Sequence, residues 1–236
     1  MKNTTKKFNI SKIILTIIFW AIGITMLVPL IWMISTACKV EADVFNFPIE
    51  WIPRRWNLVQ NMKEVWGGRY NFGLYYLNSI KVAVLATFFQ VFVSALGAYG
   101  FSKIKFKGRD ALFLAYLATM MIPPQVTIVS QFIITRQLGL YNTHAGLIAM
   151  LAFSVYGVFL LRQAMMAVPD SLSESAQIDG AGHLRIFFQI ILPMVKPSLA
   201  TLATLKFVWT WNDYQHPLVF LSNRDLYTIQ LGMKQF

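Results

Sequence analysis

The sequence predicts an all-α protein, a polytopic bundle of membrane-spanning helices, from its composition and from the spacing of its charges. Of its 236 residues, 56% are hydrophobic and only 13% are charged. A helix needs roughly 20 apolar residues to cross about 30 Å of hydrocarbon, and four charge-free windows are long enough. They lie between Lys12 and Lys39, between Lys81 and Lys103, between Asp110 and Arg136, and between Arg136 and Arg162. This pattern excludes a soluble domain.

A fifth apolar segment, from about 197 to 220, has a weaker pattern because Lys206 lies near its middle and Asp213 near its end. We expect about five spans within a single transmembrane domain over residues 1–236. The expected spans cover about 13–37, 80–102, 111–133, 144–166 and 197–220. A polar loop over about 167–196, called the 167–196 loop below, joins the last two.

The basic residues predict the orientation of the chain. One group precedes the first span and consists of Lys2, Lys6, Lys7 and Lys12, and a second group fills the turn after the second span, from Lys103 to Arg109. Cytoplasmic loops of membrane proteins carry an excess of Lys and Arg. We therefore expect the N-terminus, this turn and the 167–196 loop to lie in the cytoplasm, and the segment from Lys39 to Asn71 to lie outside.

Several other classes of protein fit less well. The net charge of +11 does not indicate nucleic-acid binding, because the cations punctuate hydrophobic segments and form no basic patch on a soluble fold. The first span is longer than the apolar region of a signal peptide, and Ser35 stands where a lipoprotein cleavage site needs Leu. Cys38 is the only cysteine, so neither an intrachain disulfide nor a cysteine-based metal site is expected.

The 167–196 loop has a sequence pattern of its own, which reads Glu174-Ser175-Ala176-Gln177-Ile178-Asp179-Gly180. A capping box is expected at its start, where Asp170 or Ser171 caps a short helix and Glu174 bonds back to the cap amide. Gly180 and Gly182 would end that helix or let another backbone approach closely. A second amphipathic piece would then run to Pro193. A polar loop between apolar spans needs a partner outside the membrane.

Written as E-x-A-x3-G-x9-I-x-L-P, the residues from Glu174 to Pro193 resemble the EAA loop of permease subunits of bacterial ABC importers. The one departure is Ser175, where that family usually has Ala. The similarity covers nearly the whole chain, and its further elements are Pro123-Pro124, Leu138 to Thr143, Leu160 to Gln163, and Trp211-Asn212-Asp213-Tyr214 with Pro217. Together they resemble the carbohydrate-uptake branch of the family, the maltose-transporter type.

The resemblance implies a multi-pass protein of the bacterial cell membrane, with two ATPase subunits, a second permease and an extracytoplasmic solute-binding protein as partners. It implies no cofactor in this chain, because the partner subunits use the ATP. No Walker A pattern, G-x4-G-K-[ST], occurs in the sequence. Glu174 would offer its carboxylate to an Arg or Lys of the ATPase, Ala176 and Gly180 would permit close docking, and Asp179 would make polar contacts or cap the helix. Glu174 has a second interpretation, as part of the intramolecular cap.

Family members usually have six spans, and the sequence from Asp213 to Phe236 is expected to be an external loop without a sixth span. Arg224, Asp225 and Lys234 interrupt it, so no run of about 20 apolar residues remains. A truncated chain and a final helix supplied from elsewhere are both compatible with this pattern.

Lys206 would lie near the bilayer midplane, where a cation at a helix centre costs about 2.5 to 3.5 kcal/mol on insertion scales. We expect a translocation path lined by Lys206, Trp209, Asn212 and Asp213. Two other interpretations stand beside it, in which Lys206 snorkels to the interface or pairs with the second permease.

A membrane-embedded enzyme and a channel are the rival classes. The enzyme is disfavoured because His144 and His216 are expected outside and His183 inside, so the three histidines cannot form one site. A channel has no evident use for a polar docking loop. Among transported solutes, a sugar, a glycosyl derivative and a glycerol phosphate fit the sequence equally.

Overall fold

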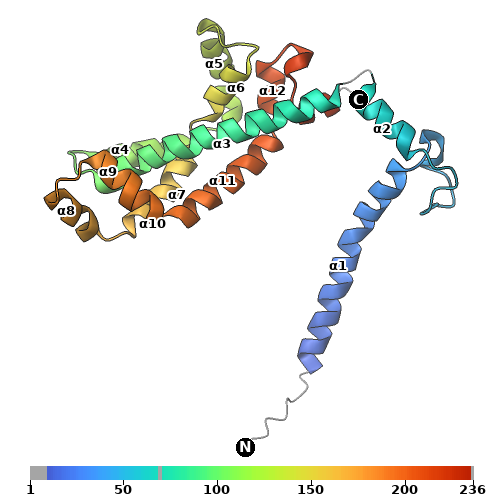
Figure 1. Cartoon of the computed structure of the whole chain (residues 1–236), viewed down its shortest axis with the longest axis horizontal. Helices are drawn as coiled ribbons and strands as arrows, with labels where there is room; N and C mark the ends of the chain where they lie inside the picture. Colours follow the sequence, from blue (N-terminus) through green and yellow to red (C-terminus); the bar gives the residue numbers. More distant parts are fainter. Residues whose placement is uncertain (1–9, 69–70, 235–236) are drawn as a thin grey trace, which may run out of the picture. The chain divides into compact units, whose positions relative to one another are not determined.

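The structure is a computed structural model that describes residues 10–68 and 71–234, and within these ranges it contains helices and no strand. The predicted all-α class is confirmed. Contacts divide the chain into two compact units, residues 1–70 and 71–236, where the sequence indicated one domain over 1–236. The two units are described in turn (Figure 1).

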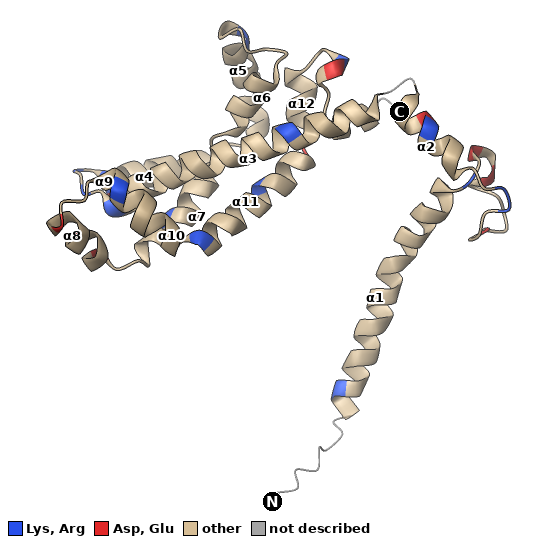
Figure 2. Cartoon of the chain, in the orientation of Figure 1, with Lys and Arg blue, Asp and Glu red and all other residues tan. Residues whose placement is uncertain are grey.

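The first unit is dominated by α1 (Ile10–Ala37), a helix of 28 residues that contains the span expected over 13–37. Its side chains are exposed on every side, and Ser35 is its one buried residue. A helix that is apolar all round needs an apolar environment on all of its faces. α1 is therefore built to be surrounded by lipid or by other membrane helices. Most of it carries no charge (Figure 2).

A small lobe with both charged and exposed aromatic residues follows α1 and contains η1 (Glu41–Asp43) and α2 (Leu58–Gly67). Asn61 on α2 joins the lobe to the end of α1. Its Nδ2 atom donates to the backbone oxygens of Ala37, at 2.9 Å, and of Lys39, at 2.8 Å. These bonds satisfy carbonyl groups that the end of a helix leaves without partners.

The second unit is organised around α3 (Phe72–Lys103), which has 32 residues and contains the span expected over 80–102. The Asn71 side chain accepts a hydrogen bond from Leu74 N–H at 3.2 Å and so caps its start. Helices α7 (Val155–Met166) and α11 (Lys196–Trp211) both pack along α3 (Figure 1). α3 is thus the central helix of this unit.

Two predicted spans are each bent within their length. The segment expected over 111–133 consists of α4 (Arg109–Ala118), η2 (Thr119–Met121) and α5 (Pro124–Gln137), with a bend of 100° before α5. Pro123 and Pro124 cause this break, because proline lacks an N–H and pushes the preceding residue out of the helical region. The segment 144–166 consists of α6 (His144–Leu151) and α7, bent by 47°.

The fifth predicted span, 197–220, is also divided. α11 ends at Trp211, and α12 (Gln215–Phe220) follows after a short break. On its other side α11 meets the helical segment 183–194 at 79°. That segment contains α9 (His183–Ile186), the π-helical η3 (Phe187–Ile191) and α10 (Leu192–Met194). If each bent pair counts as one crossing, the described chain has up to five candidate spans.

The residues after Asp213 form more structure than the expected external loop. They build α12, η4 (Arg224–Leu226) and α13 (Ile229–Met233). Asn78 Nδ2 on α3 donates to the backbone oxygens of Asp225, at 2.8 Å, and Tyr227, at 3.1 Å. The sequence does not reveal such bonds because they join residues about 150 positions apart. The tail is therefore attached to the first half of α3.

Small residues allow α7 to approach α3 closely. A Cβ atom added at Gly157 on α7 would lie 2.5 Å from Ser94 Oγ on α3, and one added at Gly97 on α3 would lie 3.2 Å from a Val158 methyl carbon. In lipid no hydrophobic force drives helices together, so such close packing supplies much of the association energy. The α3–α7 contact therefore leaves no room for a side chain at Gly157.

We expect Gly157→Ala to destabilise the protein by about 1 to 3 kcal/mol, because the added methyl group overpacks the α3–α7 contact. Gly100→Ala is the matched control, since nothing lies within 4 Å of its Cβ position in the interior of α3. That change should be neutral or stabilising. Thermal unfolding in detergent measures both, and equal melting temperatures for the two variants would contradict the packing described here.

Candidate functional site

The centre of the 167–196 loop is the helix α8 (Asp170–Ile178). The predicted site residues lie along this helix and just after it, in the order Glu174, Ser175, Ala176, Asp179 and Gly180. Ala176 is half-buried and the others are exposed. The Glu174 carboxylate forms no hydrogen bond or ion pair with any residue in the described part of the chain. Ile178, an apolar residue at the tip of a polar helix, is 87% exposed.

Gly180 ends α8 in a left-handed conformation, with φ of +81°. Its N–H donates to the Gln177 oxygen at 3.0 Å, and the Ala181 N–H donates to the Ala176 oxygen at 2.9 Å. This pair of bonds is the Schellman motif, which glycine favours because it has no Cβ atom to strain the turn. The predicted role of Gly180 in ending the helix is confirmed.

The capping box expected at the start of α8 is absent. The helix begins at Asp170, directly after Pro169, and no side chain caps it. The Asp170 carboxylate binds the Lys103 ammonium instead, because an ammonium is a stronger partner than a neutral backbone N–H. Glu174 does not take part in a cap, and its carboxylate remains available to a partner.

Lys103, the last residue of α3, binds the start of this helix. Its Nζ atom donates to the Val168 oxygen and to Asp170 Oδ1, both at 2.6 Å. The Lys103 side chain is 3% exposed and that of Asp170 is 62% exposed. The hydrogen bond and the charge of Lys103 lower the pKa of the Asp170 carboxyl below its ordinary 3.8. A lowered pKa stabilises the folded state above the unfolded pKa, so this contribution is complete at neutral pH and is lost only in strong acid.

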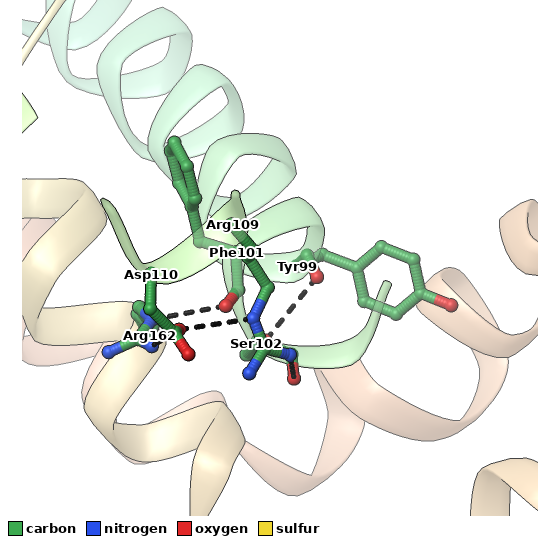
Figure 3. A network of polar contacts seen from close by, with 6 residues as sticks. All are labelled: Tyr99, Phe101, Ser102, Arg109, Asp110 and Arg162. Carbon is green, nitrogen blue, oxygen red and sulfur yellow. Dashed lines mark hydrogen bonds and ion pairs between the residues drawn. The ribbon is translucent and has the colours of Figure 1, made fainter. Parts of the chain in front are cut away.

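A second polar cluster lies beside this contact, where α3, α4 and α7 meet (Figure 3). Arg162, which is 8% exposed, donates from Nε to the Phe101 oxygen at 3.1 Å and from a terminal nitrogen to Asp110 at 3.2 Å. Its guanidinium carbon lies 4.0 Å from the centre of the Phe113 ring. Asp110 also accepts a bond from Arg109 at 3.2 Å. Arg162 therefore ties three helices together.

The far end of the loop is also attached to α3. The Tyr99 hydroxyl lies 3.4 Å from His183 Nδ1, and the Tyr99 ring centre lies 5.2 Å from that of Phe187. Tyr99 is 6% exposed and Phe187 1% exposed. Since Tyr99 lies one helical turn before Lys103, the end of α3 contacts both the start of α8 and the segment that follows it.

A polar cavity borders α8 on the side of the turn after α3. Its lining includes Lys105, Ser173, Glu174, Gln177 and His183. Acidic and basic residues gather at this end of the unit, around α8 and α9 (Figure 2). The free carboxylate of Glu174 therefore lies at the edge of a hollow with both charged and neutral polar groups.

Of the residues predicted for a translocation path, Lys206 and Trp209 lie in α11, and Asn212 and Asp213 follow its end, with Asp213 still close enough to interact electrostatically with Lys206. Lys206 is 7% exposed, lies on the same face of α11 as the buried Leu202, and forms no ion pair with the described residues. Trp209 is 51% exposed and its ring packs edge-on against Tyr156. Because α11 ends at Trp211, the helical spacing assumed in the prediction does not continue further.

The last two of these residues lie at the end of α11. Asn212 Nδ2 donates to the Val208 oxygen at 2.9 Å. Asp213 lies beyond the helix, and its carboxylate is 2.7 Å from His216 Nδ1. Within the described ranges, no group of three His, Cys, Asp or Glu residues is placed to hold a metal ion. His144 contacts the Leu226 oxygen and is not part of a cluster with the other histidines.

Residues 90–233 match the family model described as "Binding-protein-dependent transport system inner membrane component". The chain belongs to this family. It is therefore a transport permease and not an enzyme, and it is a multi-pass component of the bacterial inner membrane. The 167–196 loop, α3 from Gln90 onward and the tail up to α13 all lie within the matched region.

Three similar proteins are named as transport permeases. The chain is 34% identical to the probable ABC transporter permease YurM of Bacillus subtilis, over 88% of this chain and 69% of the relative. It is 31% identical to the diacetylchitobiose uptake permease NgcG of Streptomyces coelicolor, over 93% and 72%. It is 34% identical to the sn-glycerol-3-phosphate permease UgpE of Pectobacterium atrosepticum, over 89% and 76%.

A solved structure has the same fold. It is a bacterial ABC transporter involved in the import of the acidic polysaccharide alginate, and it superposes with a TM-score of 0.84 at 24% sequence identity. The match covers 98% of this chain and 82% of the other. Bent helices packed around one long helix are therefore an arrangement that a solved transporter also has.

Sequence reasoning did not identify the residues that position α8. Lys103 was noted only as the end of an apolar window and as a marker of orientation, Arg162 only as the end of a window and as part of the resemblance at Leu160 to Gln163, and Tyr99 not at all. A charged residue at the end of an apolar window must reach either the membrane–water interface or a polar partner. This rule was the one sequence feature that indicated a role for Lys103 and Arg162. Its partner Asp170 is 67 positions away, too far for any local pattern to reveal.

We expect Gly180→Ala to destabilise the turn after α8 by about 1 to 2 kcal/mol, because an alanine is strained at positive φ. Free space surrounds the position, so strain and not a clash is the cause. Gly182→Ala is the control, since Gly182 has ordinary φ of −74° and equally free space. Hydrogen exchange of residues 176–183 measures the effect, and equal protection in both variants would show that the turn does not depend on Gly180.

Proposed function

We propose that the chain is a permease subunit of an ATP-driven importer, that it forms half of a translocation pathway, and that its 167–196 loop couples this pathway to a separate ATPase. The observation that carries the proposal is the composition of α8. This helix presents a carboxylate without a partner, Glu174, and a bare apolar side chain, Ile178, in a polar setting. Exposed apolar groups with a polar rim are typical of protein interfaces.

The proposed partners are two ATPase subunits, a second permease and an extracytoplasmic solute-binding protein. The family name supports dependence on a binding protein. The sequence contains no Walker A pattern, so the energy of ATP would reach this chain from another subunit. In the proposed contact, Glu174 pairs with an Arg or Lys of the ATPase, and Ala176 and Gly180 allow its backbone to approach.

The proposed solute is a sugar or a small polar compound derived from one. Two relatives support this class of solute, since NgcG is named for the uptake of diacetylchitobiose and UgpE for the transport of sn-glycerol-3-phosphate. The common property of these solutes is a polyhydroxylated carbon skeleton. In this proposal Lys206, Trp209, Asn212 and Asp213 lie on or near the path of the solute.

The proposed orientation has the N-terminus and the 167–196 loop in the cytoplasm, which follows from the position of the basic residues. Residues 1–9, with three of the first four lysines, lie outside the described part of the chain. We expect cysteines introduced at Gln177 and at Ser222, each in a Cys38→Ala background, to react with an impermeant thiol reagent from opposite sides of the membrane. Both residues are exposed. Labelling of both from the same side would contradict this topology.

We expect Glu174→Lys to reduce ATP hydrolysis by the assembled transporter at least about tenfold, because reversing the charge turns a proposed pairing of more than 1.4 kcal/mol into repulsion. Glu41→Lys is the control, since Glu41 is equally exposed but lies in the lobe of the first unit. The measurement is ATPase activity in membranes together with copurification of the ATPase. Wild-type hydrolysis in the Glu174 variant would rule out this contact.

A further inference from the structure

We propose that α3 and α8 move as one rigid body during transport, and that Lys103 is the positioning residue that locks them together. The inference rests on the proposed function, because it concerns how a movement of α8 would reach the spans. It adds a transmitting element, α3, and names the residue on which the transmission depends.

The contact at the start of α8 has the properties of a lock. Lys103 Nζ makes two bonds of 2.6 Å, one to the backbone of the linker at Val168 and one to the first residue of the helix, Asp170. Because the Lys103 side chain is almost fully buried, it cannot exchange these partners for water at little cost. An ion pair with both partners exposed would not hold the helix in this way, whereas here the Lys103 side is buried.

A second contact prevents α8 from turning about this point. Tyr99 reaches the segment after α8 through His183 and Phe187. The start and the end of the loop are therefore both attached to the last two turns of α3. Because the segments before and after α8 are both held by α3, the angle of α8 to that helix is restricted.

α3 is itself attached to the tail at its other end. Asn78 holds the backbone of Asp225 and Tyr227, and Ser79 Oγ accepts a bond of 2.7 Å from the Ile229 N–H. A displacement of α8 would thus act on α3 as a whole and reach the opposite end of the unit. The displacement would not be confined to the 167–196 loop.

The test is a distance measurement between spin labels at Gln177 on α8 and Phe88 on α3, in a Cys38→Ala background and in the whole transporter with cysteine-free partners. Both residues are exposed. The probe is MgATP with vanadate, compared with the nucleotide-free state. We expect one narrow distance that shifts by less than about 1 Å between the two states, below the scale of about 1 to 2 Å of helix shifts at interfaces.

The variants Lys103→Gln and Asp170→Asn should each lose this single narrow distance, and Asp170→Asn carries the test if Lys103→Gln does not fold. Lys107→Gln is the matched control, because Lys107 lies in the turn that follows Lys103, is exposed and forms no hydrogen bond or ion pair with the described residues of α8. It should keep the wild-type distance.

Two outcomes would overturn the rigid-body proposal. One is a wild-type distance that changes between the two nucleotide states. The other is a narrow, unchanged distance in both Lys103→Gln and Asp170→Asn. A failure of the proposed function looks different, because the wild-type chain would then bring no ATPase with it, whereas the lock can still be tested from the label distances in the purified chain alone.

Discussion

The close packing of α7 and α11 against α3 is the constraint on which the other features depend. Gly157, Ser94 and Leu202 come from these three helices and meet at one point, where even an added Cβ atom would lie 2.5 Å from Ser94 Oγ and 3.3 Å from a Leu202 methyl carbon. Because α3 is fixed in this way, its two ends can serve as supports. One end carries α8, and the other carries the tail from η4 to α13.

The sequence predicted the fold class well and the helix directions poorly, for a physical reason. Charge-free windows identify apolar segments long enough to cross a bilayer, and this criterion located α1 and α3. A window measures polarity but not direction, so the bends at Pro123, between α6 and α7, and just before α11 were not predicted. The break between α6 and α7 leaves N–H groups at the start of α7 without a helical partner. One of them, the Gly157 N–H, donates to the Ser154 side chain at 3.0 Å.

The site was predictable where it depends on local spacing. Gly180 lies at a helix end because the chain needs positive φ there, and the sequence indicates this directly. The capping box was wrong for two reasons: Lys103 binds Asp170 from another helix, and Ser171, which has the right spacing to Glu174, lies inside α8, which begins at Asp170. The predicted path residues show the same limit. Lys206, Trp209 and Asp213 have helical spacing in the sequence, and the helix ends before Asp213, although Asp213 still interacts electrostatically with Lys206. Their place on a path stays a prediction.

The central claim is that α8 is the surface that contacts an ATPase. The most direct measurement places a photoreactive amino acid at Ile178, which is 87% exposed, and for comparison at Val129 on α5, which is 62% exposed. After irradiation of membranes that hold the whole transporter, the probe at position 178 should link the chain to the ATPase and the probe at position 129 should not. The absence of that link at position 178, or an equal yield at both positions, would contradict the account.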